Sequence, residues 1–145
     1  MTEHVQDYRA VAERELGPDD AVLELGAAGG LTTALAASRA ASAVGVDANP
    51  SMEANMIALQ DKLAAEHTNL QFRQQDAFHT GGLLQLQSEL AAVPGTDFQG
   101  FTAVFIDLSG SRELGPVLKL VETLEDPSVF GSTLRLVVVK AYRYY

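Results

Sequence analysis

Short apolar runs alternate along the chain with segments in which apolar residues recur every three or four positions. The short runs have the length and composition of buried strands, and they lie at residues 21–25, 43–47, 70–75, 101–106 and 134–139. The run at 134–139 is almost entirely aliphatic and β-branched, which makes it the strongest of the five strand predictions.

The segments with helical spacing stand before and between these runs. Val5, Tyr8 and Leu16 open the chain with this pattern, and Gly17-Pro18 ends it. Further helices are predicted over residues 31–39, 50–63, 83–90 and 117–124. Helices and strands therefore alternate along the whole chain.

This alternation predicts the fold class. Strands separated by helices pair in parallel, because each right-handed crossover returns the chain to the end of the sheet at which the previous strand began. We therefore predict an α/β fold with a doubly wound, mostly parallel five-stranded sheet and helices on both faces, as in Rossmann-like proteins. Residues 1–145 contain no second hydrophobic block, Ser/Gly linker or internal repeat, so we predict a single domain.

Composition narrows the possible chemistry. The chain has no cysteine, which excludes disulfides, thiolate metal sites and a cysteine nucleophile. Residues 1–10 are mainly charged and polar, and no apolar run approaches the ~20 residues of a membrane span. We expect a soluble, cytoplasmic protein with no membrane partner. The net charge of −9 disfavours nucleic-acid partners, because it repels phosphates at long range.

The predicted turn after the first strand is rich in small residues. Ligands of such sheets bind at the carboxyl ends of the strands, so this turn is part of the candidate site. It reads Glu24-Leu25-Gly26-Ala27-Ala28-Gly29-Gly30, and small residues let a backbone turn sharply and approach a ligand closely. The dinucleotide pattern G-x-G-x-x-G is not met, because Leu31 stands at its third glycine.

The same turn resembles the E/D-x-G-x-G-x-G motif of class I S-adenosylmethionine-dependent methyltransferases. Glu24 matches the leading acid, and Ala28 replaces the middle glycine. Gly26 and Gly30 match the other two glycines. The resemblance implies that the cofactor is S-adenosyl-L-methionine, a small-molecule methyl donor.

A second stretch, at residues 47–52, resembles the D-x-[SN]-P-x-M segment of the same family. The resemblance implies that Asp47 accepts hydrogen bonds from the ribose hydroxyls of the donor. It also implies that Ala48 lies beside the nucleoside and that Met52 covers one face of the adenine.

The remaining strand ends also match positions that this family uses. Asp76 is implied to accept a hydrogen bond from the adenine amino group, with Ala77 and Phe78 beside the ring. Asp107 is implied to face the methyl-transfer centre, where an acid orients or deprotonates the acceptor. Lys140, at the end of the fifth predicted strand, is the second catalytic candidate.

Two subfamilies share part of the pattern around Asp107. Phe105-Ile106-Asp107 resembles the F-I-D of cation-dependent catechol-type O-methyltransferases. Lys140-Ala141 stands where that subfamily has an Asp-Asn metal pair, so no metal ligand is predicted. Asp107 with Lys140 also resembles ribose 2′-O-methyltransferases, although the amino-terminal lysine of that subfamily has no counterpart before Lys62.

The strand-end acids together predict an S-adenosylmethionine-dependent methyltransferase with an unidentified acceptor. One alternative is a regulatory or degenerate protein that binds the donor without turnover. A ribose 2′-O-methyltransferase and an NAD-dependent dehydrogenase have less support. Family members usually continue with a sixth and a seventh strand, which we do not find before Tyr145. If the fold ends there, we expect the fifth strand to be an open edge through which a homodimer can form; if the protein continues, part of the acceptor pocket belongs to the later segment.

Overall fold

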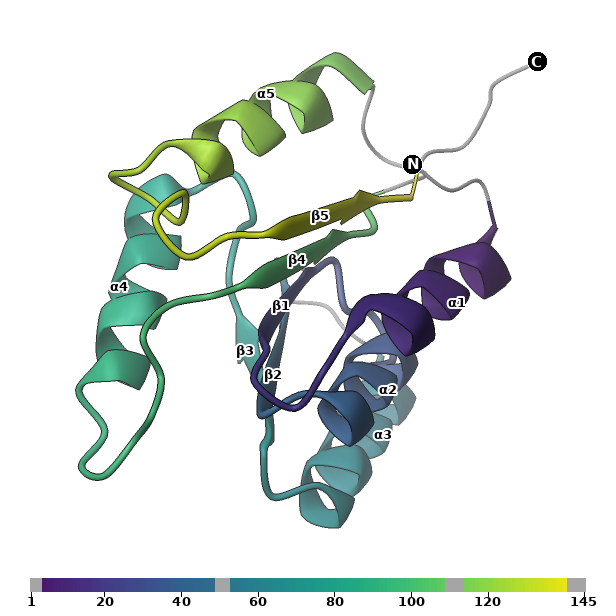
Figure 1. Cartoon of the computed structure of the whole chain (residues 1–145). Helices are drawn as coiled ribbons and strands as arrows, with labels where there is room; N and C mark the ends of the chain where they lie inside the picture. Colours follow the sequence, from purple (N-terminus) through teal and green to yellow (C-terminus); the bar gives the residue numbers. More distant parts are fainter. Residues whose placement is uncertain (1–3, 49–52, 109–113, 141–145) are drawn as a thin grey trace.

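The fold is described from a computed structural model that covers residues 4–48, 53–108 and 114–140 (Figure 1). Helices and strands alternate, in the order α1 (Val5–Glu15), β1 (Ala21–Leu25), α2 (Leu31–Arg39), β2 (Ser42–Asp47), α3 (Ala54–Glu66), β3 (Leu70–Gln74), α4 (Thr80–Ala91), β4 (Ala103–Ile106), α5 (Leu114–Glu125) and β5 (Leu136–Val139). The strands form one sheet in the order β3-β2-β1-β4-β5, and every neighbouring pair is parallel. The prediction of a doubly wound parallel sheet is confirmed.

Each face of the sheet carries its own hydrophobic core. Figure 1 shows α1, α2 and α3 on one side of the sheet and α4 and α5 on the other. Leu23 and Leu25 of β1 belong to the core with α4 and α5, whereas Val22 belongs to the core with α1 and α2. Because side chains alternate along a strand, Glu24 projects to the same face as Val22, beneath α1 and α2.

The last two strands begin two residues later than the apolar runs predicted. Phe101 is fully buried, but its ring packs against Phe98 and Phe130 before β4 begins. The Leu134 amide donates to the carbonyl of Phe130 in the preceding turn. The apolar composition of these runs overextended the strands, because Phe101 lies in the core and Leu134 packs against it before either strand begins. The predicted start of the third helix, Pro50, lies outside the described residues.

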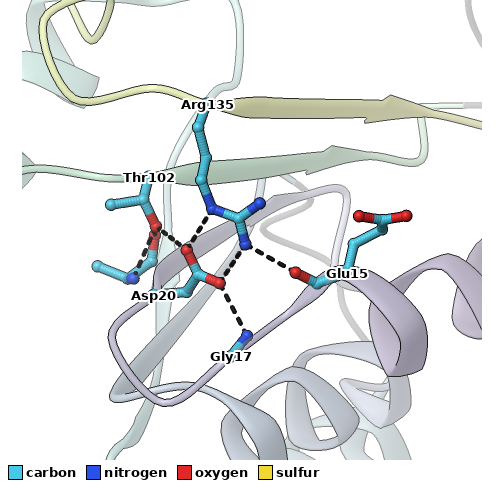
Figure 2. A network of polar contacts seen from close by, with 6 residues as sticks. Glu15, Gly17, Asp20, Thr102 and Arg135 are labelled. Carbon is cyan, nitrogen blue, oxygen red and sulfur yellow. Dashed lines mark hydrogen bonds and ion pairs between the residues drawn. The ribbon is translucent and has the colours of Figure 1, made fainter.

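A buried carboxylate joins the amino ends of three strands (Figure 2). Asp20 Oδ1 accepts hydrogen bonds from Thr102 Oγ1 at 2.7 Å and from Arg135 Nε at 2.8 Å. Asp20 Oδ2 accepts from the Gly17 amide and from Arg135 Nη2, which also donates to the Glu15 carbonyl. Burial by itself would raise the pKa of Asp20. The hydrogen bonds from Arg135, Gly17 and Thr102 outweigh burial and hold this pKa below its ordinary value. This network lies at the amino ends of the strands, whereas the candidate site lies at their carboxyl ends.

Candidate functional site

The turn between β1 and α2 depends on glycine at two positions. Gly26 has φ 85° and Gly30 has φ 88°, both in the left-handed region. A Cβ on Gly26 would lie 2.1 Å from the carbonyl oxygen of Asp107, and a Cβ on Gly30 would lie 2.5 Å from the ring of Phe72. The turn therefore packs directly against the end of β4 and against β3, which leaves no room for side chains at these two positions.

Ala28, at the middle of the turn, also has a left-handed backbone, with φ 45°. Its amide donates to Asp47 Oδ2 at 3.0 Å, and its carbonyl accepts from Gln60 Nε2 of α3. Non-glycine residues adopt this conformation at a cost of about 1 kcal/mol, which these two hydrogen bonds offset. The end of β2 and helix α3 thus hold the exposed tip of the turn.

Asp76 and its neighbours form a tight turn after β3. Asp76 is exposed, and its Oδ1 accepts from the Phe78 amide at 2.9 Å, which is an Asx turn. Ala77 is buried, and Phe78 is half-buried against the core of the α4 and α5 face. Ala48 is exposed directly after β2, and Met52 lies outside the described residues.

Asp107 and Lys140 meet at the ends of β4 and β5. Lys140 Nζ lies 2.9 Å from Asp107 Oδ2, and the two side chains are 7% and 23% exposed. The register that pairs Phe105 with Val138 brings both residues to the same face of the sheet, two positions further along. This ion pair is therefore mostly withdrawn from water, which strengthens the attraction between its charges.

Glu24 lies behind the turn and is almost completely buried. Its Oε1 accepts from Thr33 Oγ1 of α2 at 2.6 Å, and its Oε2 accepts from the Tyr8 hydroxyl of α1 at 3.1 Å. Burial, with a smaller contribution from the charge of Asp107, raises the pKa of Glu24 to about 7, although the hydrogen bonds from the two hydroxyl groups act to lower it. Its carboxyl group therefore contacts two helices from beneath the site.

The strand order brings these groups to one edge of the sheet. From β3 to β5, the carboxyl ends carry Asp76, Asp47, the Gly26–Gly30 turn, Asp107 and Lys140. The roles of these residues toward a nucleoside or a reacting centre stay predictions. No three His, Asp or Glu side chains come close enough to bind a metal in the part of the chain that the structure describes. None of the described helices is long and apolar enough to cross a bilayer.

Three residues of the site were not singled out from the sequence. The sequence pattern indicates Tyr8 only as part of an apolar helix face, and it assigns no role to Thr33 or Gln60. Glu24 was itself a signal, because an acid within an apolar strand requires hydrogen-bond partners when it is buried. The identity of those partners depends on which helices cover β1.

Comparisons with known proteins give a fold and no close relative. Neither the protein-family models nor the curated protein sequences contain a match to this chain. Among solved structures, the 23S rRNA methyltransferase ErmE shares 20% identity with it, with a TM-score of 0.58 over 96% of this chain and 47% of that chain. An rRNA methylase from Streptococcus thermophilus gives 12% identity and a TM-score of 0.60 over 96% and 73%.

A third similar solved structure contains a bound ligand. An RNA methyltransferase from Salinibacter ruber, in complex with S-adenosyl-L-homocysteine, shares 17% identity, with a TM-score of 0.57 over 93% of this chain and 72% of that chain. The chain has the Rossmann-like fold of class I methyltransferases. It spans about half the length of ErmE.

Proposed function

We propose that the protein binds S-adenosyl-L-methionine and transfers its methyl group to an acceptor held near Asp107. The observation that carries this proposal is the row of acids around the Gly26–Gly30 turn, at the carboxyl edge of a methyltransferase fold. The complex of the Salinibacter ruber enzyme with S-adenosyl-L-homocysteine supports the choice of donor.

The residues at this edge fit such a donor. Gly26 and Gly30 bring backbone to the edge where side chains would block it, and the first turn of α2 follows directly. Asp47 would hold the ribose from the end of β2, next to Ala48. The donor carries a cationic amino group and a sulfonium, which suit an edge lined by carboxylates.

We place the adenine of the donor at the end of β3, the strand next to β2. Asp76 would accept from the adenine amino group, and the turn that it stabilises places Ala77 and Phe78 beside the ring. Met52 keeps its proposed role over the other face of the adenine. Glu24 would act from behind the turn, through the hydrogen bonds that it accepts beneath the site.

The proposed chemistry needs few reactive groups from the protein. The donor, when bound, supplies an activated methyl group, so that positioning the acceptor accounts for much of the rate. Asp107 would orient the acceptor and accept its proton. Lys140, whose Nζ lies 2.9 Å from Asp107 Oδ2, would fix the direction of that carboxylate.

The net charge of the chain limits the class of methyl acceptor but does not identify it. The net charge of −9 disfavours a long polyanion, although ErmE and the two other matched proteins are described as RNA methylases. A ribosomal RNA fragment and a protein-free metabolite extract are therefore the two acceptor pools to compare. The expected homodimer through β5, which lies at the edge of the sheet, stays a prediction for sedimentation analysis.

Donor binding is tested first. In isothermal titration, S-adenosyl-L-methionine and S-adenosyl-L-homocysteine should bind, and NAD should give no heat. Asp47→Ala should abolish binding, whereas Asp61→Ala, on the exposed surface of α3, should leave it unchanged. Binding of NAD alone would overturn the proposal.

Methyl transfer is tested second. Labelled donor should pass its methyl group to one of the two acceptor pools, and Asp107→Ala should eliminate the transfer while donor binding persists. Donor binding without transfer to any fraction would favour the non-catalytic alternative.

A further inference from the structure

Helix α1 contacts both elements that flank the glycine turn: Arg9 Nε donates to Thr32 Oγ1 of α2 at 3.0 Å, and the buried Tyr8 hydroxyl reaches Glu24 of β1. Tyr8 is completely buried, and its ring packs edge-on against Phe105 with the centroids 5.3 Å apart. At this depth its hydroxyl requires a partner, and it donates to Glu24 Oε2 at 3.1 Å. The bond joins residues that lie 16 positions apart, on α1 and on β1.

The same carboxyl group also receives the start of α2. Thr33 Oγ1 donates to Glu24 Oε1 at 2.6 Å. Thr33 is held tightly in turn, because a Cβ on Gly45 would lie 2.7 Å from its Oγ1. Glu24 stands two residues before Gly26, and Thr33 stands three residues after Gly30. The hydrogen bond between them therefore closes the base of the turn on both sides.

We propose that Tyr8 is a positioning residue for the Gly26–Gly30 turn. Its hydroxyl holds the Glu24 carboxyl group against Thr33 and thereby fixes the separation between the end of β1 and the start of α2. Helix α1 thus controls the shape of the turn without contacting a ligand. The consequence for donor affinity rests on the proposed function, whereas the effect on the turn does not.

The positioning role of Tyr8 can be measured through the titration of Glu24, because the groups around Glu24 set its pKa. Tyr8 and Arg9 face it from α1, Thr33 from α2, and Asp107 from the end of β4, where Asp107 is paired with Lys140 of β5. The two hydroxyl groups donate to the ionised form of Glu24, which opposes the effect of burial on its pKa. Removal of the Tyr8 hydroxyl should therefore shift the titration of Glu24 to higher pH.

The test compares Tyr8→Phe with Val11→Ala. Tyr8→Phe removes only the hydroxyl and keeps the ring on Phe105, whereas Val11→Ala weakens the packing of α1 without touching the hydrogen bond. In the ligand-free protein, hydrogen exchange is followed at the Gly26, Ala27 and Gly30 amides, which donate to backbone carbonyls within and beside the turn.

Tyr8→Phe should speed exchange at these amides more than Val11→Ala does, and it should weaken binding of S-adenosyl-L-homocysteine about fivefold. The midpoint of the pH dependence of binding should rise in Tyr8→Phe and stay unchanged in Val11→Ala. In a Glu24→Met background, which removes both acceptor oxygens, Tyr8→Phe should have no further effect on the exchange rates or on binding, because it acts through Glu24.

Two results would overturn the inference: equal exchange rates in the two α1 variants, or additive effects of Tyr8→Phe and Glu24→Met. If Tyr8→Phe does not fold, Thr33→Val tests the same carboxyl group from α2, and it must then speed exchange at the turn. If the wild-type protein gives no heat with S-adenosyl-L-homocysteine, the proposed function fails. In that case, faster exchange in Tyr8→Phe still supports the positioning of the turn.

Discussion

Glu24 should make the stability of this protein fall as the pH rises from about 5 to 7. Its pKa is raised from 4.5 to about 7 in the folded protein, mainly by burial. The folded state then binds the proton more strongly than the unfolded chain does. The stabilisation is complete below the unfolded pKa and is lost as the pH rises through the folded pKa.

The size of the effect follows from the shift. About 2.5 pKa units correspond to about 3 kcal/mol of free energy of unfolding, lost almost entirely by pH 7. About 2 kcal/mol of this is lost between pH 5 and pH 7, so with a urea m-value of about 2 kcal/mol/M the unfolding midpoint should fall by about 1 M over this range. Glu24→Gln keeps the shape of the side chain and cannot ionise, so its midpoint should not show this fall.

The assay is urea unfolding at several pH values between 5 and 8, followed by circular dichroism. The wild-type protein is compared with Glu24→Gln and with Glu122→Gln, which changes an exposed glutamate on α5. Only Glu24→Gln should flatten the pH dependence. Equal slopes in the wild type and in Glu24→Gln would refute the assignment of the buried proton to Glu24.

Three further predictions concern other parts of the fold. Gly26→Ala should lower the free energy of unfolding by more than about 2 kcal/mol in urea melts and abolish donor binding, because its Cβ would meet the Asp107 carbonyl. Gly115→Ala in α5, where a Cβ meets nothing within 4 Å, should not destabilise the protein. Asp20→Asn should cost about 2 kcal/mol at pH 7 in thermal melts. Because the pKa of Asp20 is lowered, this difference should be present above pH 3.8 and shrink as the pH falls further. Lys140→Met should reduce methyl transfer about 100-fold in a labelled-donor assay while calorimetry shows donor binding retained; unchanged transfer would contradict the role of its ion pair with Asp107.

Much of the candidate site was predicted from short stretches of sequence. Gly26 and Gly30 were assigned from a local motif, and their positive φ angles explain why glycine stands there. Asp47 is the last residue of β2, and Asp76 and Asp107 follow β3 and β4 by two positions and by one, so a parallel sheet brings the three acids to the same end of the strands. Their roles toward a donor remain predictions, with the binding experiments as their test.

The contacts that hold the site together could not be predicted in the same way. Tyr8 and Glu24 lie 16 residues apart, and Asp107 and Lys140 lie 33 apart. Each pair depends on which helix covers β1 and on β5 being next to β4. Side-chain patterns within one element do not contain that information.

The sequence by itself determined the alternation of strands and helices, the parallel sheet and the row of acids at its carboxyl edge, because periodicity and turn residues act over a few positions. The tertiary structure alone decided that Glu24 is buried beneath α1 and α2. It also decided that Asp107 is paired with Lys140 and that Asp20 joins three strands at the opposite edge. These features arise from the order of the strands and the packing of helices between distant segments, which set the burial and the partners of Glu24 and Asp20 and hence the pKa of each.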